Sequence, residues 1–303
     1  MAIDLRKLAP RTLFLNERNR AERKFYKLIN KLLTMLEKRL RGSNPKTPTE
    51  LKRTITQIAN TPTFRQASEE AARQTVTMLA VSQKRTWQEA AAESSQGHMI
   101  HEALKKEMKA TTLGGRVDQI IQENAQMIKT VPQDMAERFT KMAQENWTKG
   151  LRSDEIVEEL MKRAPELRRF EAKRIARTET SKASTAMIQA RAEIYNRPFY
   201  YWRPCMDERT RKTHRAMDGI ICRWDDPPNP EAKFGGKSYG SYHPGCIFNC
   251  RCIPEPILSI DRIQFPCRAW IHGEVVTIRS AKAFRERFGL PQKASAEGKA
   301  QKQ

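Results

Sequence analysis

The chain has 303 residues, enough for one large hydrophobic core or for two domains. Its 56 lysines and arginines exceed its 35 aspartates and glutamates, which gives a formal net charge of +21. A charge of this size attracts polyanions, so nucleic acid is the favoured partner and an ordinary cytoplasmic enzyme is disfavoured. The sequence contains no run of about eighteen uncharged apolar residues, and its first residues lack the apolar core of a signal peptide. We therefore expect neither a membrane span nor export by that route.

The start of the sequence predicts a helix with a basic surface. Apolar residues recur at helical spacing from Phe25 to Leu40 between lysines and arginines, with Asn16 as the cap and Gly42 as the stop. This pattern is typical of a basic amphipathic helix. Its basic face suits nucleic acid or an acidic protein surface, but packing on neighbouring helices is the interpretation that we favour.

Three further helical segments are predicted before residue 130. Residues 47–60 begin with a threonine cap, a proline at the first helical position and a glutamate placed to reach back to the cap. Residues 61–92 have a second Thr-Pro start and a composition of strong helix formers. Residues 98–130 continue in this style, and we expect the two adjacent glycines Gly114 and Gly115 to break the helix.

Prolines and glycines divide the next stretch. Pro132 is expected to open a helix that Gly150 ends. Residues 153–162 predict a short helix whose acidic first turn matches the helix dipole. Pro165 is expected to begin a long helix that runs to about Tyr195.

The pattern changes again after the last of the long helices. Residues 253–260 form an extended apolar stretch with two prolines, and residues 273–278 read as a strand. Ser280 is expected to cap a short basic helix that ends at Gly289. Residues 292–303 carry no apolar pattern and predict a disordered basic tail.

These elements predict an α+β protein, with a mainly α-helical N-terminal region and a small C-terminal module of short strands and loops that contains cysteine and histidine. We divide the chain into a basic helical region at 1–150, the module at 151–256, a small strand and helix extension at 257–291, and the tail at 292–303.

The stretch from Trp202 to Cys252 holds five of the six cysteines and two of the five histidines. Two polar clusters, one ending near Gly219 and one beginning at His243, are separated by a loop rich in glycine and proline. We expect the module to fold back on itself so that the two clusters meet. Clustered cysteines also fit a reducing compartment better than a secreted disulfide framework.

A metal site is one interpretation of this stretch. Its soft ligands are sufficient for a tetrahedral zinc site, which would stabilise a small module with many loops. The candidate ligands are Cys205, His214, Cys246, Cys250 and Cys252. The spacing contains no Cys-x-x-Cys pair, and Cys250 and Cys252 share a face only if their segment is extended. Free buried thiols are the alternative.

Catalysis is a second interpretation. His214 and His243 with Asp207 have the residue types for general acid–base chemistry on a phosphodiester, and nearby arginines would stabilise the developing charge. No nuclease signature matches their order or spacing. A buried hydrogen-bonded network that holds the loops in place is the interpretation that we favour.

The order of these residues resembles the minor head protein, or head morphogenesis, family of tailed phages, the group of the phage Mu F protein. The matching segments are Ala176-Arg177-Thr178-Glu179, Trp202, Asp207-x-Arg209-x-Arg211-x-x-His214, Asp218-Gly219, Pro244-Gly245 and Asn249-Cys250-Arg251-Cys252. Together they cover roughly residues 150–255. Cys205, Cys222 and Cys246 are not part of the family's pattern, so the resemblance does not imply a metal site.

The resemblance implies a virion component of low copy number inside the capsid head, assembled in the host cytoplasm. Its implied partners are the portal protein, packaged double-stranded DNA bound without sequence preference, and the scaffold or the major capsid protein. Its implied role is head assembly or genome delivery, without enzymatic activity. The alternative is an ejected DNA-acting enzyme, a nuclease or toxin, that uses His214 and His243.

Under the leading interpretation, the matching residues hold the module together or form its contact surface. These residues are Arg177, Thr178, Glu179, Trp202, Asp207, Arg209, Arg211, His214, Asp218, Gly219, Asn249, Cys250, Arg251 and Cys252.

Overall fold

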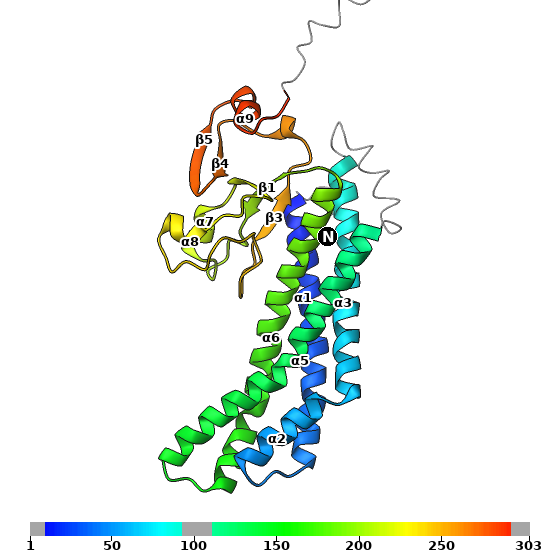
Figure 1. The fold of residues 1–303 in the computed structure, drawn as a ribbon, viewed down its shortest axis with the longest axis vertical. Helices are drawn as coiled ribbons and strands as arrows, with labels where there is room; N and C mark the ends of the chain where they lie inside the picture. Colours follow the sequence, from blue (N-terminus) through cyan, green and yellow to red (C-terminus); the bar gives the residue numbers. More distant parts are fainter. Residues whose placement is uncertain (1–9, 93–110, 292–303) are drawn as a thin grey trace, which may run out of the picture.

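The computed structural model describes residues 10–92 and 111–291, which form a long helical bundle with a small sheet module at one end (Figure 1). The bundle helices are α1 (Pro10–Gly42), α2 (Pro48–Ala59), α3 (Pro62–Ala92), α5 (Thr111–Thr148) and α6 (Ser153–Ile194). None of the helices in these two ranges is long and apolar enough to span a membrane.

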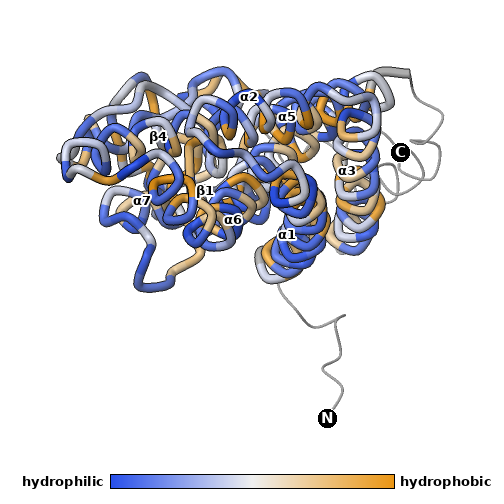
Figure 2. The backbone as a smooth tube through the Cα atoms, turned by 90° about the horizontal axis from the view of Figure 1, so that it is seen from below, coloured by the Kyte–Doolittle hydropathy of each residue, from blue (hydrophilic) through white to orange (hydrophobic). Residues whose placement is uncertain are grey.

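The four long helices share one hydrophobic core. Helix α1 packs against α3 and α6, and α5 closes the bundle by packing against the same two helices. On α1, Phe25, Ile29, Leu33 and Leu36 are almost fully buried, which confirms that the apolar face of this basic helix packs inside the bundle. Hydrophilic and hydrophobic residues alternate along α1 in Figure 2.

The structure corrects four of the predicted helix boundaries. Helix α5 continues through Gly114, Gly115 and Pro132, and α6 continues through Pro165. An internal proline costs about 3 kcal/mol and a glycine about 1 kcal/mol in a helix. Burial of apolar side chains on both sides of Pro132 offsets this cost, because the helix packs along its length on its neighbours. Asn16 lies within α1 and not at its cap.

Other start and stop signals are confirmed. Thr47 caps α2, and its hydroxyl accepts a hydrogen bond from the Glu50 amide at 3.2 Å. The Glu50 carboxylate reaches back one residue further than expected and accepts from the Lys46 amide. Ser280 caps the last helix in the same way.

The module contains one five-stranded sheet with the order β3-β1-β2-β4-β5, in which β2 and β4 are parallel and the other pairs antiparallel. The strands are β1 (Phe199–Arg203), β2 (Ile221–Arg223), β3 (Ile253–Pro256), β4 (Cys267–Ile271) and β5 (Glu274–Ile278). The short helices are α7 (Lys212–Ala216), α8 (Pro230–Phe234), η3 (Ile260–Arg262) and α9 (Ala281–Arg287). The predicted α+β class is therefore confirmed.

The side chains of β1 point alternately to the two faces of the sheet, and each face packs against a different hydrophobic core. Tyr200 and Trp202 belong to the core shared with Trp87 of α3, whereas Phe199 packs on the other face against Phe284 of α9. Because this first core includes side chains from α1, α3 and α6, the ends of the long helices position the loops of the module.

The acidic side chain of Glu17 is partly buried between α1 and α3. Glu17 accepts a hydrogen bond from the Thr86 hydroxyl at 2.5 Å, and its second oxygen has no partner among the described residues. Burial raises the pKa of Glu17 to about 7, and Glu89 also raises it, although Thr86, Arg85 and Arg191 act in the opposite direction.

We expect Glu17→Gln to stabilise the protein at pH 8 and to have a much smaller effect at pH 5. The carboxyl binds a proton more tightly in the folded state, so its contribution to stability falls as the pH rises through about 7. Glutamine stays neutral, and the expected gain at pH 8 is about 1–3 kcal/mol, below the full value of the shift because Glu17 is only partly buried. Urea unfolding at both pH values measures this difference. The exposed Glu137→Gln is the control, and an equal change at both pH values would contradict the prediction.

Candidate functional site

The two polar clusters of the module meet around a small cavity of about 20 Å³. The loop after β1 and helix α7 form one side, and the segment before β3 forms the other. The lining residues are Cys205, Arg209, Thr210, Arg211, His214, Asn249, Cys250, Arg251 and Cys252. All nine belong to the stretch that the sequence singled out, and they come from the two predicted clusters.

An ion pair joins the two sides of the cavity. Both guanidinium Nη atoms of Arg251 donate to the carboxylate of Asp207, at 2.6 Å for the Nη2 to Oδ1 contact. The Thr210 hydroxyl donates to Asp207 Oδ1 at 3.1 Å, and Arg211 donates to the Phe248 carbonyl at 3.1 Å. The hydrogen bonds from Arg251 and Thr210 hold the pKa of Asp207 below its usual value. The loop that carries Cys205 is thereby tied to the segment that carries the two later cysteines.

His214 lies at the centre, with only 2% of its surface exposed. Its Nε2 atom is 2.9 Å from the Tyr242 hydroxyl and 3.3 Å from Glu231 Oε1, and the Tyr242 hydroxyl donates to Glu231 Oε2 at 2.6 Å. Since Tyr242 uses its proton on Glu231, both groups near Nε2 act as acceptors toward His214. The proton of a neutral His214 is therefore assigned to Nε2, and the lone pair to Nδ1.

The lone pair of His214 faces two thiols. Its Nδ1 atom is 3.3 Å from Cys252 Sγ and 3.6 Å from Cys250 Sγ, and one ligand atom from each of the three residues lies within 4.8 Å of the others. Burial opposes ionisation of Cys250, but the hydrogen bond from Cys252 lowers the pKa of Cys250 well below its usual value. Burial and the nearby Cys250 raise the pKa of Cys252, so the two thiols titrate as a coupled pair.

The other metal candidates are placed differently. Cys205 lines the same cavity but does not belong to the group of three, and Cys246 lies outside both. Burial raises the pKa of Cys246 to about 12. Of the five candidate ligands, the structure therefore brings together His214, Cys250 and Cys252, with Cys205 beside them.

The catalytic candidates have separate partners. His243 Nδ1 lies 2.9 Å from the Tyr200 hydroxyl, and its ring packs against Trp224. Burial lowers the pKa of His243 to about 4. Within the described part of the chain, His214 and His243 do not share a hydrogen bond, and Asp207 is engaged by Arg251.

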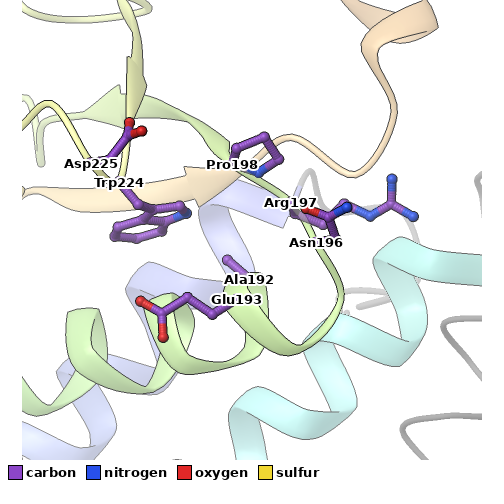
Figure 3. A pocket seen from close by; sticks show the side chains of 7 residues that line it. All are labelled: Ala192, Glu193, Asn196, Arg197, Pro198, Trp224 and Asp225. Atoms are coloured by element: carbon purple, nitrogen blue, oxygen red, sulfur yellow. The ribbon is translucent and has the colours of Figure 1, made fainter. Parts of the chain in front are cut away.

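A larger pocket lies elsewhere in the molecule. It has a volume of about 360 Å³ at the C-terminal end of α6, and Figure 3 shows the side chains that line it, among them Glu193, Arg197 and Trp224. None of the predicted ligand, catalytic or contact residues lines this pocket.

Helix α6 supports the site from the bundle side. Its Thr178 hydroxyl accepts a hydrogen bond from the Asn249 amide at 3.2 Å, and its Thr185 hydroxyl donates to the Pro244 carbonyl at 2.5 Å. Arg177 pairs with Glu22 of α1 at 3.4 Å, and Glu179 pairs with Lys182 at 3.1 Å. Thr178 thus joins the module directly, whereas Arg177 and Glu179 pair within the bundle.

Trp202, Asp218 and Gly219 lie along β1 and the turn before β2. The Gly219 amide donates to the Trp202 carbonyl at 3.0 Å, and Asp218 pairs with Arg203 at 3.6 Å. Arg209 is two-thirds exposed and 3.9 Å from Asp207. These contacts order the strand that carries Trp202, while Arg209 remains available to solvent.

Three residues of the site were not predicted from the sequence. Glu231 and Tyr242 hold the ring of His214, and Arg18 of α1 donates to the Arg251 carbonyl. Glu231 follows an Asn-Pro helix start, which is a local signal for an ordered position. Tyr242 stands next to His243, one of the candidate residues. No local signal identifies Arg18, which lies more than 200 residues before Arg251 in the sequence.

The fold and the site define a basic helical-bundle protein with a small sheet module that encloses a cluster of histidine and cysteine. Residues 104–254 match the family described as Phage Mu protein F like protein. This match confirms the resemblance and supports a phage head morphogenesis-like family for this region of the chain. The match begins before residue 151, where we placed the start of the module, and it takes in α5, which packs along α6.

A curated relative adds a second comparison. An uncharacterized protein of Haemophilus influenzae is 28% identical over 147 residues, which make up 48% of this chain. The chain covers only 30% of the length of that relative. No solved structure shows a significant match to the chain.

Proposed function

We propose that the protein is a minor capsid protein that lies inside the phage head near the portal and contacts packaged double-stranded DNA. Its role is head assembly, genome delivery or both. The observation that carries this proposal is the match of residues 104–254 to the phage Mu protein F like family. The net charge of +21 supports contact with DNA, because neutralising phosphates releases counterions without any need for base recognition.

The exposed face of α1 is the surface that fits DNA. Five of the exposed basic residues of this helix lie on the face opposite the bundle core, and none of the five forms an ion pair with a residue that the structure describes. They are Arg20, Arg23, Lys27, Lys31 and Lys38. We call this set the α1 basic stripe. It follows the helical repeat on the face opposite the bundle core, so its charges are available to an external polyanion.

The geometry favours a structural role over the alternative of an ejected nuclease. A general base must reach a proton on its substrate. His214 is buried and both of its ring nitrogens have partners, while His243 is bonded to Tyr200 in the core of the module. We therefore assign these histidines to holding the module together.

We expect the purified full chain to bind the portal protein of the same phage or prophage genome, and to retain this binding in high salt and without DNA. Contacts within a packed protein interface are less sensitive to salt than contacts between exposed charges. A pull-down at low and high salt, with and without DNA, measures this. The cognate major capsid and scaffold proteins serve as parallel baits and show which head component is contacted.

Two results would oppose the proposal. Loss of all portal binding, with DNA binding remaining, would remove the assignment to the portal vertex. Cleavage of DNA by the wild-type chain, but not by His214→Ala, would establish the enzymatic alternative, provided that circular dichroism shows the variant to be folded.

A further inference from the structure

The assigned tautomer of His214 points to a metal ligand. Its Nε2–H is used by the buried acceptors Tyr242 and Glu231, and this arrangement aims the lone pair of Nδ1 at Cys250 and Cys252. A histidine that binds zinc usually donates its other N–H to a carboxylate in this way, which orients the ring and makes it a stronger ligand. Glu231 is 3% exposed, and it also accepts hydrogen bonds from Tyr242 and Thr213, which fix its carboxylate beside the ring.

The ligand atoms have the spacing of a tetrahedral site. Zinc bonds of about 2.3 Å to sulfur and about 2.0 Å to nitrogen place two tetrahedral ligands roughly 3.5–3.8 Å apart. The distances from His214 Nδ1 to Cys252 Sγ and Cys250 Sγ are 3.3 and 3.6 Å. Cys252 directly precedes β3, and the side chains of residues 250 and 252 both reach His214 Nδ1.

A hydrogen-bond donor and a buried cation lie beside the sulfur atoms. The Gly245 amide donates to Cys250 Sγ at 3.3 Å. Arg18 is 0% exposed, and its Nε has no hydrogen-bond partner among the described residues. The acidic groups that act on its charge are Cys205, Cys250, Cys252 and Glu22, and Glu22 is paired with Arg177. A buried guanidinium needs a nearby negative charge. Zinc with one histidine and three thiolates carries a single net negative charge, which Arg18 would balance.

Cys205 is the residue that can complete the set. It lines the same cavity of about 20 Å³, which has room for a single ion. The Asp207–Arg251 ion pair holds the Cys205 loop across the segment between Cys250 and Cys252. Met206, which follows Cys205, adopts a left-handed φ of 60°, an uncommon conformation that this tethered loop maintains.

We propose that the module binds one structural zinc ion through His214 Nδ1 and the thiolates of Cys250 and Cys252, with Cys205 as the fourth ligand. The ion links the loop after β1 to the segment before β3, two parts of the chain that otherwise meet through side-chain contacts. This site does not depend on the function proposed above.

The first test is the metal content of the reduced full chain, expressed with ample zinc and measured by plasma mass spectrometry. We expect about one zinc per chain, a loss of most of it in Cys252→Ser, and no loss in the control Cys267→Ser. Cys267 is a buried cysteine of β4 that lies outside the cavity. Equal zinc in the wild type and in Cys252→Ser would overturn the proposal, because the metal would then lie elsewhere.

The second test begins with the wild-type chain, so its main result does not depend on a variant that fails to fold. Cobalt added to chelator-treated protein should give the intense visible bands of a tetrahedral site and a near-ultraviolet thiolate band. Cys205→Ser should lower the thiolate band by about one-third if three thiolates bind. An unchanged band would remove Cys205 from the set, and a wild-type chain that is folded but gives no cobalt spectrum would overturn the site.

Discussion

Gly245→Ala is expected to lower the free energy of unfolding by about 3 kcal/mol or more. Gly245 has a φ of +85°, where a side chain costs about 1–2 kcal/mol. A Cβ at this position would lie 2.8 Å from Thr185 Oγ1 and 3.1 Å from the carbonyl oxygens of Cys252 and Ser181. Two of these contacts are with α6, so the loop would have to move away from the helix, which adds an overpacking cost of about 1–3 kcal/mol.

A matched variant separates backbone strain from the contact with α6. Gly240 has a nearly identical φ of +83°, but a Cβ there would meet nothing within 4 Å. Gly240→Ala should therefore cost only the strain, about 1–2 kcal/mol. Urea denaturation of both variants measures the difference. Equal losses of stability would show that the close approach of Gly245 to Thr185 does not hold the module against the bundle.

Neutralising part of the α1 basic stripe should weaken DNA binding on the order of a hundredfold at low salt. The variant carries glutamine at Lys27, Lys31 and Lys38, which are exposed and lie on one face of the helix. Each phosphate contact that is lost lowers the slope of log K against log salt by about 0.9, so the slope should fall by roughly 2–3. Fluorescence anisotropy with random-sequence duplexes over a salt series measures both quantities.

The control for this variant removes the same charge from another surface. Arg152, Lys162 and Arg163 lie on or beside α6, are exposed, and are each paired with a nearby glutamate. Replacing these three residues with glutamine should leave the salt slope almost unchanged, because their charges are already offset locally. An equal loss of affinity in both triple variants would mean that total charge, and not the α1 basic stripe, governs DNA binding.

Local chemistry in the sequence predicted much of the fold. The cap at Thr47, the caps and stops around Ser280 and Gly289, and the periodic apolar residues of α1 each act through neighbours a few residues away. The change from helical to strand-like patterns also predicted the α+β class. These features depend on short-range contacts, so a single sequence is sufficient to recognise them.

Packing between helices decided where the long helices end. Gly114, Gly115, Pro132 and Pro165 are strong local signals for a break, yet α5 and α6 run through them. Each helix buries apolar side chains against two neighbours over its whole length, and this burial outweighs a local cost of a few kcal/mol. Such a sum of distant contacts is not visible within a window of the sequence.

The candidate site also depends partly on local residue types and partly on contacts between distant parts of the chain. His214, Cys250 and Cys252 were recognisable as a group because their chemistry is distinctive, and residue order alone indicated the phage Mu F-like family. The assigned proton position on His214 depends on Glu231, and the buried charge facing the thiols comes from Arg18 in the first helix. Residue types therefore predicted which side chains could bind a metal or a proton. Only the tertiary structure brought together the partners that set their protonation. The reason is that burial and electrostatic interactions involve atoms that lie far apart in the sequence.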